Sequence, residues 1–372
     1  MRLVIQKDYE RVSRWIAFLI LFIFNSGFTA AQTNQLASFS DPANLWGNGV
    51  ERIIEEAYRK CIRTKIIDGR VMNIRIPFAM NTERDILLKT PINFIEDGKG
   101  SPEILWPIIE NILDSKEFAE YIKALSSGHE KVIIFDLVER SWSISSDLFI
   151  IARLKTDLFS GLPHRPYVLT SGRGATESDV YNYIYCIGLV GMDCSGFVWH
   201  VLSYTARKGG VDLGRALSSA LGVSVRANYS QFIGTSFFSS KNSQIIQVTD
   251  EIRNLRPADV MLFRDVDGEV VHSAVIQSVD FKKGVIRYLH CNNFSLPEER
   301  GVHESFIYFD PSNPSASLKD PSLHWTQKRY APFIGEDFNF ADDGERYRNR
   351  ANGGGKVIRL KALVPVIERL RK

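Results

Sequence analysis

The sequence has little cysteine and no pair of cysteines at metal-binding or redox spacing. Four of its 372 residues are cysteine, and no Cys-x-x-Cys is present. This argues against a zinc ribbon and a thioredoxin-like redox centre, since both need closely spaced thiols. An internal repeat is lacking, and so is a large excess of one charge, because the formal net charge is only +3. A chain of this charge gives no sign of a nucleic-acid partner.

The chain also lacks an apolar run of comfortable membrane-spanning length. Its N-terminal apolar run extends only from Trp15 to Phe24, whereas a span needs about 20 residues. Basic residues precede the run and small residues follow at 29–31, which is the pattern of a secretory signal peptide over residues 1–31. An uncleaved anchor is the alternative. We expect an exported protein of the periplasm or cell envelope, without membrane contact beyond this segment.

What is present is an ordinary globular composition, 44% hydrophobic and 24% charged, which fits packed cores. Residues 32–160 are expected to form a mixed α/β accessory region without a catalytic constellation. Such a region would bind the cell wall, bind a partner or buttress a second domain. The patterns predict a helix that opens at Asp41-Pro42 or nearer Val50 with Cys61 facing a core, a strand over 72–78, helices from 101 and over 118–125, and further elements over 131–138 and 148–154.

Residues 165–365 are expected to form an α+β domain, in which a helix is followed by consecutive antiparallel strands. Phe197, Val198, Val201 and Leu202 fall on one face of that helix, and Gly209-Gly210 ends it. The predicted strands cover 260–263, 270–279, 285–291 and 357–363, and residues 366–372 read as a short basic tail.

Cys194 is the candidate nucleophile. Asp193 or Ser195 can cap the helix, which puts Cys194 at or beside its first residue. There the unpaired N–H groups and the helix dipole stabilise an anion and lower the pKa of a thiol. A small buried cysteine without chemistry is the plainer interpretation of the same pattern.

Two histidines complete the arrangement. His272 lies on the strand after a Pro-x-Asp turn, and His290 lies near the end of the next antiparallel strand. If the helix packs on this sheet, Cys194 can reach His272 and His290 can orient it, which is the logic of a cysteine hydrolase. Asn292 or Asn293 is an alternative orienting residue. His200 is expected to pack or to be partly exposed, and His303 lies in a loop-like context with no partner pattern.

The sequence resembles the NlpC-type cell-wall cysteine peptidases. Residues 193–198, Asp-Cys-Ser-Gly-Phe-Val, match the nucleophile motif of that family. Residues 256–263 resemble its Arg-Pro-Gly-Asp strand motif, residues 272–276 its His-Val-Gly-Ile-Tyr motif, and residues 288–291 the strand that supplies the third polar residue. The resemblance covers about residues 165–295 and implies a papain-like catalytic domain, with the nucleophile helix packed on an antiparallel sheet.

The chain departs from the family pattern in several places. Ala258 and Ala274 stand where the family has glycine, and the interval from Cys194 to the Pro-x-Asp turn is long. The tyrosine that assists the oxyanion site in the family has no clear counterpart, with Tyr167 favoured over Tyr185. Cys186 and Cys291 flank the site in sequence and either pair or simply pack.

The resemblance implies hydrolysis of a peptidoglycan stem peptide between γ-D-glutamate and a diamino acid. Cys194 would attack, His272 would move the proton and His290 would hold His272, with no metal or cofactor. An amidase or acyltransferase with the same chemistry is the nearest alternative, because one fold hosts several reactions. A catalytically weak wall-binding scaffold is the alternative from another class. The sequence does not indicate an oligomeric state.

Overall fold

The computed structural model describes residues 49–78, 101–126, 131–136, 141–146, 167–170, 172, 174–188, 190–221, 235–264, 268–292, 300–330, 340–348 and 354–371. They belong to one compact unit, Trp46–Lys372. Several sequence predictions fall outside these residues: the signal peptide, a helix start at Asp41-Pro42, the element over 148–154 and most of the hairpin turn at 265–268.

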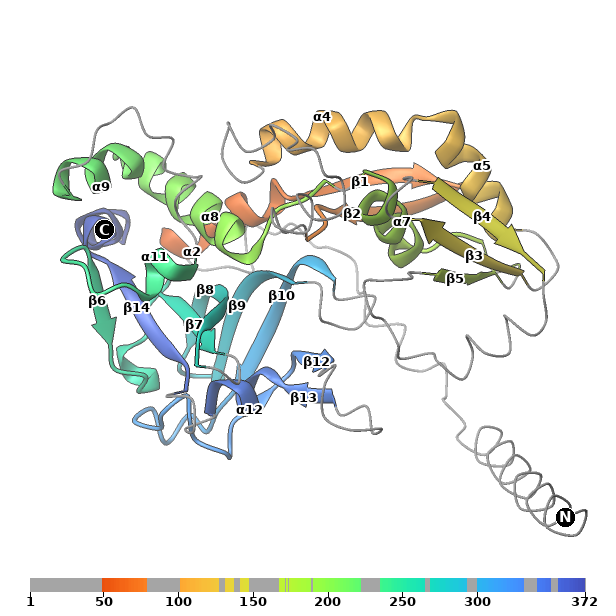
Figure 1. The fold of residues 1–372 in the computed structure, drawn as a ribbon. Coiled ribbons are helices and arrows are strands. Elements are labelled where there is room, and N and C mark those ends of the chain that lie inside the picture. Colours follow the sequence, from red (N-terminus) through yellow and green to blue (C-terminus); the bar gives the residue numbers. More distant parts are fainter. Residues whose placement is uncertain are drawn as a thin grey trace, which may run out of the picture. The chain divides into compact units, whose positions relative to one another are not determined.

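The fold class is α+β, as predicted, and its largest part is a seven-stranded antiparallel sheet (Figure 1). The strand order is β11-β10-β9-β8-β7-β14-β6. The three strands expected after the helix are all present, and β8 and β9 extend slightly beyond their predicted ends. The bounds are β6 Ile245–Val248, β7 Val260–Arg264, β8 Val270–Asp280, β9 Val285–Asn292, β10 Gly301–Tyr308, β11 His324–Trp325 and β14 Lys356–Leu360.

The last strand lies inside the sheet. β14 pairs with β7 on one side and β6 on the other, which confirms the predicted strand. The basic tail expected after it is wrong: Val364–Leu370 forms helix α13, whose Val366 and Ile367 are buried. The apolar pair gives this segment a side to bury, so it packs although basic residues follow it.

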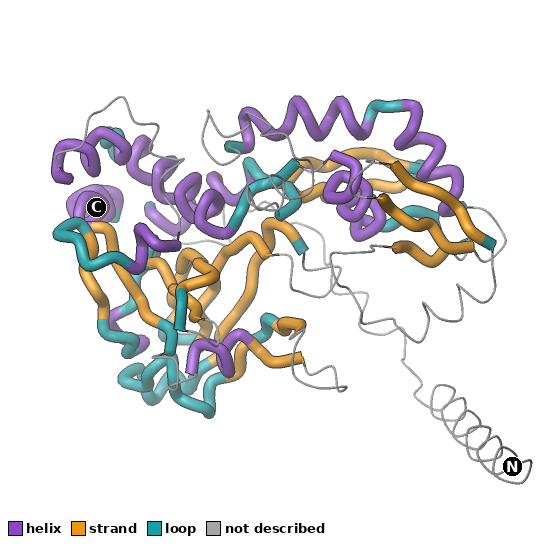
Figure 2. The backbone as a smooth tube through the Cα atoms, in the orientation of Figure 1, coloured by secondary structure: helices purple, strands orange, loops and turns teal. Residues whose placement is uncertain are grey.

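Helix α8 (Cys194–Lys208) carries the candidate nucleophile at its first residue and ends at Gly209, as predicted. Its apolar stripe of Phe197, Val198, Val201 and Leu202 is completely buried. Part of this stripe packs against the sheet and part against α2 (Val50–Arg59). Figure 2 shows α8 as a helix lying over strands of the sheet.

The N-terminal elements form smaller sheets with covering helices (Figure 1). A hairpin of β1 (Ile62–Ile67) and β2 (Arg70–Arg75) follows α2 directly. Strand β1 was not predicted, and β2 starts and ends earlier than expected, with Met72 and Ile74 buried in alternation. The helices expected from 101 and over 118–125 are present as α4 (Pro102–Leu113) and α5 (Lys116–Leu125).

A second small sheet has the order β4-β3-β5. β3 (Lys131–Asp136) lies within the element predicted over 131–138, whereas β4 (Ser141–Ser145) was not predicted, and the third strand is β5 (Tyr167–Thr170). β5 pairs with β3 although about thirty residues separate them in sequence. The other described elements are α7 Glu177–Tyr183, the π-helix η4 Ile184–Gly188, α9 Leu213–Leu221, α11 Thr235–Ser239, η5 Ile252–Asn254, β12 Lys328–Tyr330, β13 Phe340–Asp342, α12 Asp343–Arg348 and η8 Lys361–Leu363.

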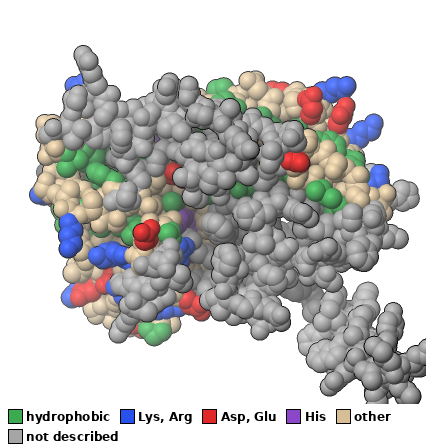
Figure 3. All heavy atoms as spheres, in the orientation of Figure 1, with side chains coloured by type: hydrophobic (Ala, Val, Ile, Leu, Met, Phe, Trp, Pro, Cys, Tyr) green, Lys and Arg blue, Asp and Glu red, His purple; other side chains and the backbone are tan. Residues whose placement is uncertain are grey.

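Surface charge is mixed where it can be seen. On the face drawn in Figure 3, acidic and basic side chains are interspersed over the described residues, in line with the small net charge. Among the helices that the structure describes, none has both the length and the apolar character needed to cross a bilayer.

His200 ties α8 to α2 and makes the fold sensitive to acid. Its Nε2 lies 3.1 Å from the carbonyl oxygen of Ala57, and the side chain is buried. Burial lowers the pKa of His200 from 6.5 to about 4. Between these two pH values the unfolded chain therefore binds a proton that the folded chain does not, so stability falls as the pH falls through this window.

We expect the free energy of unfolding to drop by at most about 3 kcal/mol between pH 7 and pH 4 because of His200. Denaturant unfolding at a series of pH values measures this drop. In His200→Gln, which keeps a side-chain donor but does not titrate, the pH dependence in this window should become flatter. An unchanged slope in that variant would assign the acid sensitivity to other groups.

Candidate active site

The N-terminus of α8 is fixed by its own capping residue. Asp193 has extended backbone, and its Oδ1 accepts hydrogen bonds from the Gly196 N–H at 2.6 Å and the Ser195 hydroxyl at 2.7 Å. Asp193 is therefore the N-cap, one of the two residues expected for that role. Cys194 follows as the first helical residue and is 6% exposed, so its sulfur lies at the positive end of the helix dipole.

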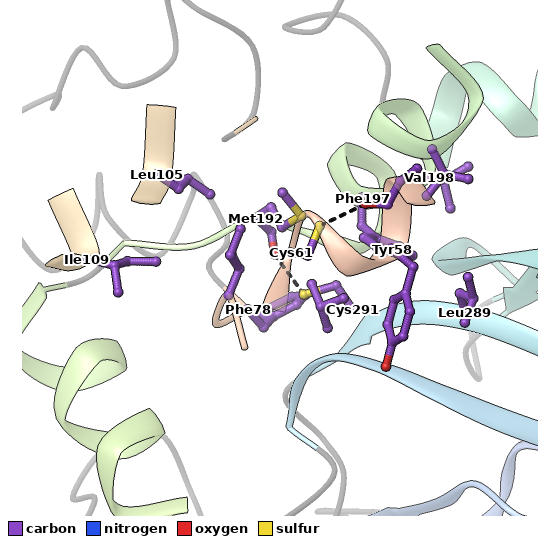
Figure 4. Packing of buried hydrophobic residues seen from close by; sticks show 14 of the residues in the cluster. Tyr58, Cys61, Phe78, Leu105, Ile109, Met192, Phe197, Val198, Leu289 and Cys291 are labelled. Atoms are coloured by element: carbon purple, nitrogen blue, oxygen red, sulfur yellow. Dashed lines mark hydrogen bonds between the residues drawn. The ribbon is translucent and has the colours of Figure 1, made fainter. Parts of the chain in front are cut away.

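The turn before α8 is held from two sides. The N–H of Met192 donates to the Pro77 carbonyl at 3.0 Å, and Met192 forms a parallel bridge with Phe78. From the large sheet, the thiol of Cys291 contacts the Met192 carbonyl oxygen at 3.2 Å (Figure 4). Residues 76–78, which follow β2, thus help to place the nucleophile turn, so part of the N-terminal region buttresses the candidate site.

Cys194 lies beside β8 next to the predicted base. Its Sγ is 4.0 Å from the carbonyl oxygen of Val271, the residue before His272. His272 is buried, and its Nε2 lies 2.9 Å from Nδ1 of His290 on the neighbouring strand. The structure therefore places Cys194 beside the strand that carries His272 and brings His272 into contact with His290, and the catalytic roles of the three residues stay predictions.

Sequence reasoning missed the polar side chains behind His290. The Nε2 of His290 lies 3.1 Å from the Ser305 hydroxyl on β10. The ring of His303, also on β10, has its centroid 4.1 Å from that of His290. The loop-like setting expected for His303 is wrong, because His303 is a buried strand residue directly opposite His290. The apolar and aromatic residues from Val302 to Tyr308 were a strand signal that the prediction did not use.

The remaining candidates are resolved as follows. The four cysteines Cys61, Cys186, Cys194 and Cys291 are free thiols, so the possible disulfide between Cys186 and Cys291 is absent. Burial raises the pKa of the Cys61, Cys186 and Cys291 thiols, which makes them poor nucleophiles.

The structure places two of the other candidates, Tyr185 and Asn292, in the described part of the chain. Tyr167 lies on β5, but its side chain is outside the description. Tyr185 is buried in η4, and its ring stacks on that of Tyr181. Asn292 is buried at the end of β9, whereas Asn293 lies outside the described residues. The hydrogen bond from His272 goes to His290, which favours His290 as the orienting residue.

The turn that replaces the family's Pro-Gly-Asp keeps a glycine-like conformation. Ala258 has φ 72°, a left-handed value that costs a residue with a Cβ about 1 kcal/mol. Asp259 after it is fully buried and accepts two hydrogen bonds from Arg359 on β14, at 2.6 and 2.7 Å. This bidentate pair joins the start of β7, which is the neighbour of β8, to β14.

No three His, Cys, Asp or Glu side chains in the described part of the chain are grouped as metal ligands. The three neighbouring histidines instead bond to one another or to neutral groups.

Comparison with known proteins gave no match to a family model, a curated protein or a solved structure.

Proposed function

We propose that the protein is an exported cysteine endopeptidase that hydrolyses peptidoglycan stem peptides through a Cys194 thioester. The observation that carries the proposal is the position of Cys194. It is the first residue of α8, and its sulfur lies beside Val271, next to His272, which is itself bonded to His290. Nucleophile, base and orienting group in this order are what amide hydrolysis by a thiol requires.

In the first half of the reaction the thiol proton passes to His272 and the sulfur attacks the amide carbonyl carbon. His272 bonds to His290 through Nε2, so the proton would move to Nδ1. Collapse of the tetrahedral intermediate breaks the C–N bond, and the leaving amine takes that proton from His272. The product is an acyl-enzyme with a thioester at Cys194.

The second half returns the enzyme to its starting state. Water attacks the thioester carbon and gives one proton to His272, the C–S bond breaks, and the sulfur recovers the proton as the acid is released. In both halves a negative oxygen develops. The N–H groups at the start of α8 would stabilise it, with Cys194 N–H the nearest to the reacting carbon.

The substrate class rests on the resemblance of residues 193–198 and 272–276 to the cell-wall peptidases and on the signal-like N-terminus. Peptidoglycan lies in the compartment to which such a signal would send the protein. The bond between γ-D-glutamate and the diamino acid is the one we expect to be cut.

The test is digestion of purified peptidoglycan by residues 32–372, followed by mass spectrometry of the soluble products. New muropeptides should appear with the unmodified chain and be absent with Cys194→Ala, and their masses would identify the bond. Cys186→Ala is a matched control, since it removes another buried thiol away from α8. Equal products from the Cys194→Ala protein would remove Cys194 from the mechanism, and no products from any of the three would point to another amide substrate.

A further inference from the structure

The hydrogen bonds of the candidate site continue well past His290. Ser305 Oγ lies 2.9 Å from Oε1 of Gln327, which follows β11. The same Oε1 lies 2.6 Å from Nε2 of His303, and Nδ1 of His303 lies 2.9 Å from the Gly301 carbonyl oxygen. From His272 to His303, each residue of this chain is at most 3% exposed. Its protons are therefore set by the partners inside the protein.

The far end of the chain fixes where its protons lie. A backbone carbonyl can only accept, so Nδ1 of His303 must carry a hydrogen toward Gly301. On the other side of the ring lies the amide oxygen of Gln327, which only accepts, and in this amide orientation Nε2 of His303 carries a second hydrogen. A histidine that donates from both nitrogens is an imidazolium. The separation of 2.6 Å fits a bond of this kind, because charge-assisted hydrogen bonds are short.

From there the direction of each bond follows in turn. Ser305 gives its single hydroxyl hydrogen to Gln327, so it accepts from Nε2–H of His290. Neutral His290 then has an unprotonated Nδ1, which accepts from Nε2–H of His272. Neutral His272 in turn has an unprotonated Nδ1. This is the tautomer that can take a proton from a thiol.

We infer that Ser305, Gln327 and a positively charged His303 are positioning residues that hold His272 in the tautomer of a general base, acting through His290. The inference rests on the proposed function in so far as His272 is that base. Rotating the Gln327 amide by half a turn would present its NH₂ group to His303 and Ser305. Every donor in the chain would then reverse, and the hydrogen of His272 would move to Nδ1.

A residue with a buried carboxylate, Asp343, is joined to the hydrogen-bond chain through Gln327 and Tyr288. Asp343, at the start of α12, is fully buried, and its N–H donates to the Gln327 carbonyl at 3.0 Å. Its Oδ2 accepts from the hydroxyl of Tyr288 at 3.3 Å, and the Tyr288 ring contacts that of His290. A buried cation is costly without an opposite charge, and Asp343 is the carboxylate that adjoins Gln327 in this network.

The other titratable or charged groups on the packed strands are differently placed. His290 and His272 are members of the chain itself and are neutral in this arrangement. Arg287 and Glu304 form an ion pair at 2.5 Å, at positions that alternate with Tyr288 on β9 and His303 on β10, so they belong to the opposite face. Arg300 precedes β10 and has the same alternation relative to Gly301 and His303.

The experiment is ¹⁵N NMR of the histidine ring nitrogens in residues 32–372, without substrate. Signals are assigned with His272→Gln and His303→Gln. At pH 7 we expect His303 with both nitrogens protonated and His272 with a proton on Nε2 only. A neutral His303 together with a proton on Nδ1 of His272 would overturn the inference, since it is the arrangement with the amide reversed.

Two substitutions of Gln327 provide a second test of the inference. In Gln327→Glu the side chain can still accept from both neighbours. Its negative charge should keep His303 protonated at a proton concentration at least tenfold lower than in the unmodified protein, which means at a higher pH. In Gln327→Met the chain is cut, and alkylation of Cys194 by iodoacetamide should slow at least tenfold. Equal alkylation rates and pH profiles in the three proteins would reject the positioning role.

The two proposals fail in different ways. The expected ring protonation without any cleavage of peptidoglycan would reject the hydrolase and keep the hydrogen-bond chain. Cleavage with the reversed protonation would keep the hydrolase and reject the inference.

Discussion

Replacing His272 with alanine is expected to reduce kcat by about 10⁴-fold or more, with little change in KM. The reason is that thiol deprotonation and protonation of the leaving amine both pass through this ring in the proposed mechanism. Its contacts with substrate in the ground state are few by comparison, so substrate binding should persist. Steady-state hydrolysis of a soluble stem-peptide fragment, with amine release followed by mass spectrometry, measures both constants.

The same assay separates the base from the residue that orients it. His290 bonds to His272 through a ring nitrogen, so kcat of His290→Ala should fall about 10²- to 10³-fold. This loss lies within the usual range for acid–base assistance, and it is smaller than the loss expected for His272→Ala. His290→Asn, which can still accept from His272, should recover part of this loss. His200→Gln serves as a control, because His200 is a buried histidine that bonds to the Ala57 carbonyl of α2. A His272→Ala enzyme within tenfold of the unmodified enzyme would contradict the mechanism.

Replacing Arg287 with methionine is expected to lower the free energy of unfolding by about 3–5 kcal/mol. The Arg287 side chain is 3% exposed, and its guanidinium lies 2.6 Å from Glu55 of α2. Without it the Glu55 carboxylate, whose side chain is 7% exposed, would keep a single ionic partner among the described residues, Arg59 at 2.8 Å. Guanidinium chloride unfolding followed by circular dichroism measures the change.

A paired substitution tests the reason. Removing both charges, in Arg287→Met with Glu55→Met, should recover much of the lost stability, since two apolar side chains replace a buried ion pair at little cost. Glu304→Gln is the exposed control, because Glu304 is 40% exposed and such pairs contribute at most about 1 kcal/mol. If the double variant is as unstable as Arg287→Met alone, shape and not unpaired charge accounts for the loss.

Local patterns were sufficient for α8 and for the strands β7, β8, β9 and β14 of the large sheet. Ser101-Pro102 and the periodicity of α8 gave helix starts that the structure reproduces. β1 was missed because Ile62 continues the apolar spacing of α2 by chance. The Asp68-Gly69 turn, with both φ values positive, was the signal for a hairpin there. The pairing of β5 with β3 has no local signature, since it depends on contacts between distant segments.

In the candidate site too, residues in short local motifs were predicted, and residues that depend on contacts between distant segments were not. Cys194, His272 and His290 were found because each stands in a short motif. Ser305 and Gln327 stand in none, and they join the site only because β10 and β11 extend the sheet beyond β9. The sequence also could not show that residues 76–78 hold the turn before Cys194, since more than a hundred residues separate them.

The place of β14 bears on how the protein acquires its structure during synthesis. The strand formed last along the chain separates β7 from β6, so β6 has no partner in the large sheet until Lys356–Leu360 has left the ribosome. Until then the edge of β7 that faces away from β8 is open, and open edges pair readily with other chains. We therefore expect the seven-stranded sheet to be completed only after translation ends, with nascent chains depending on chaperones or on transport in an unfolded state.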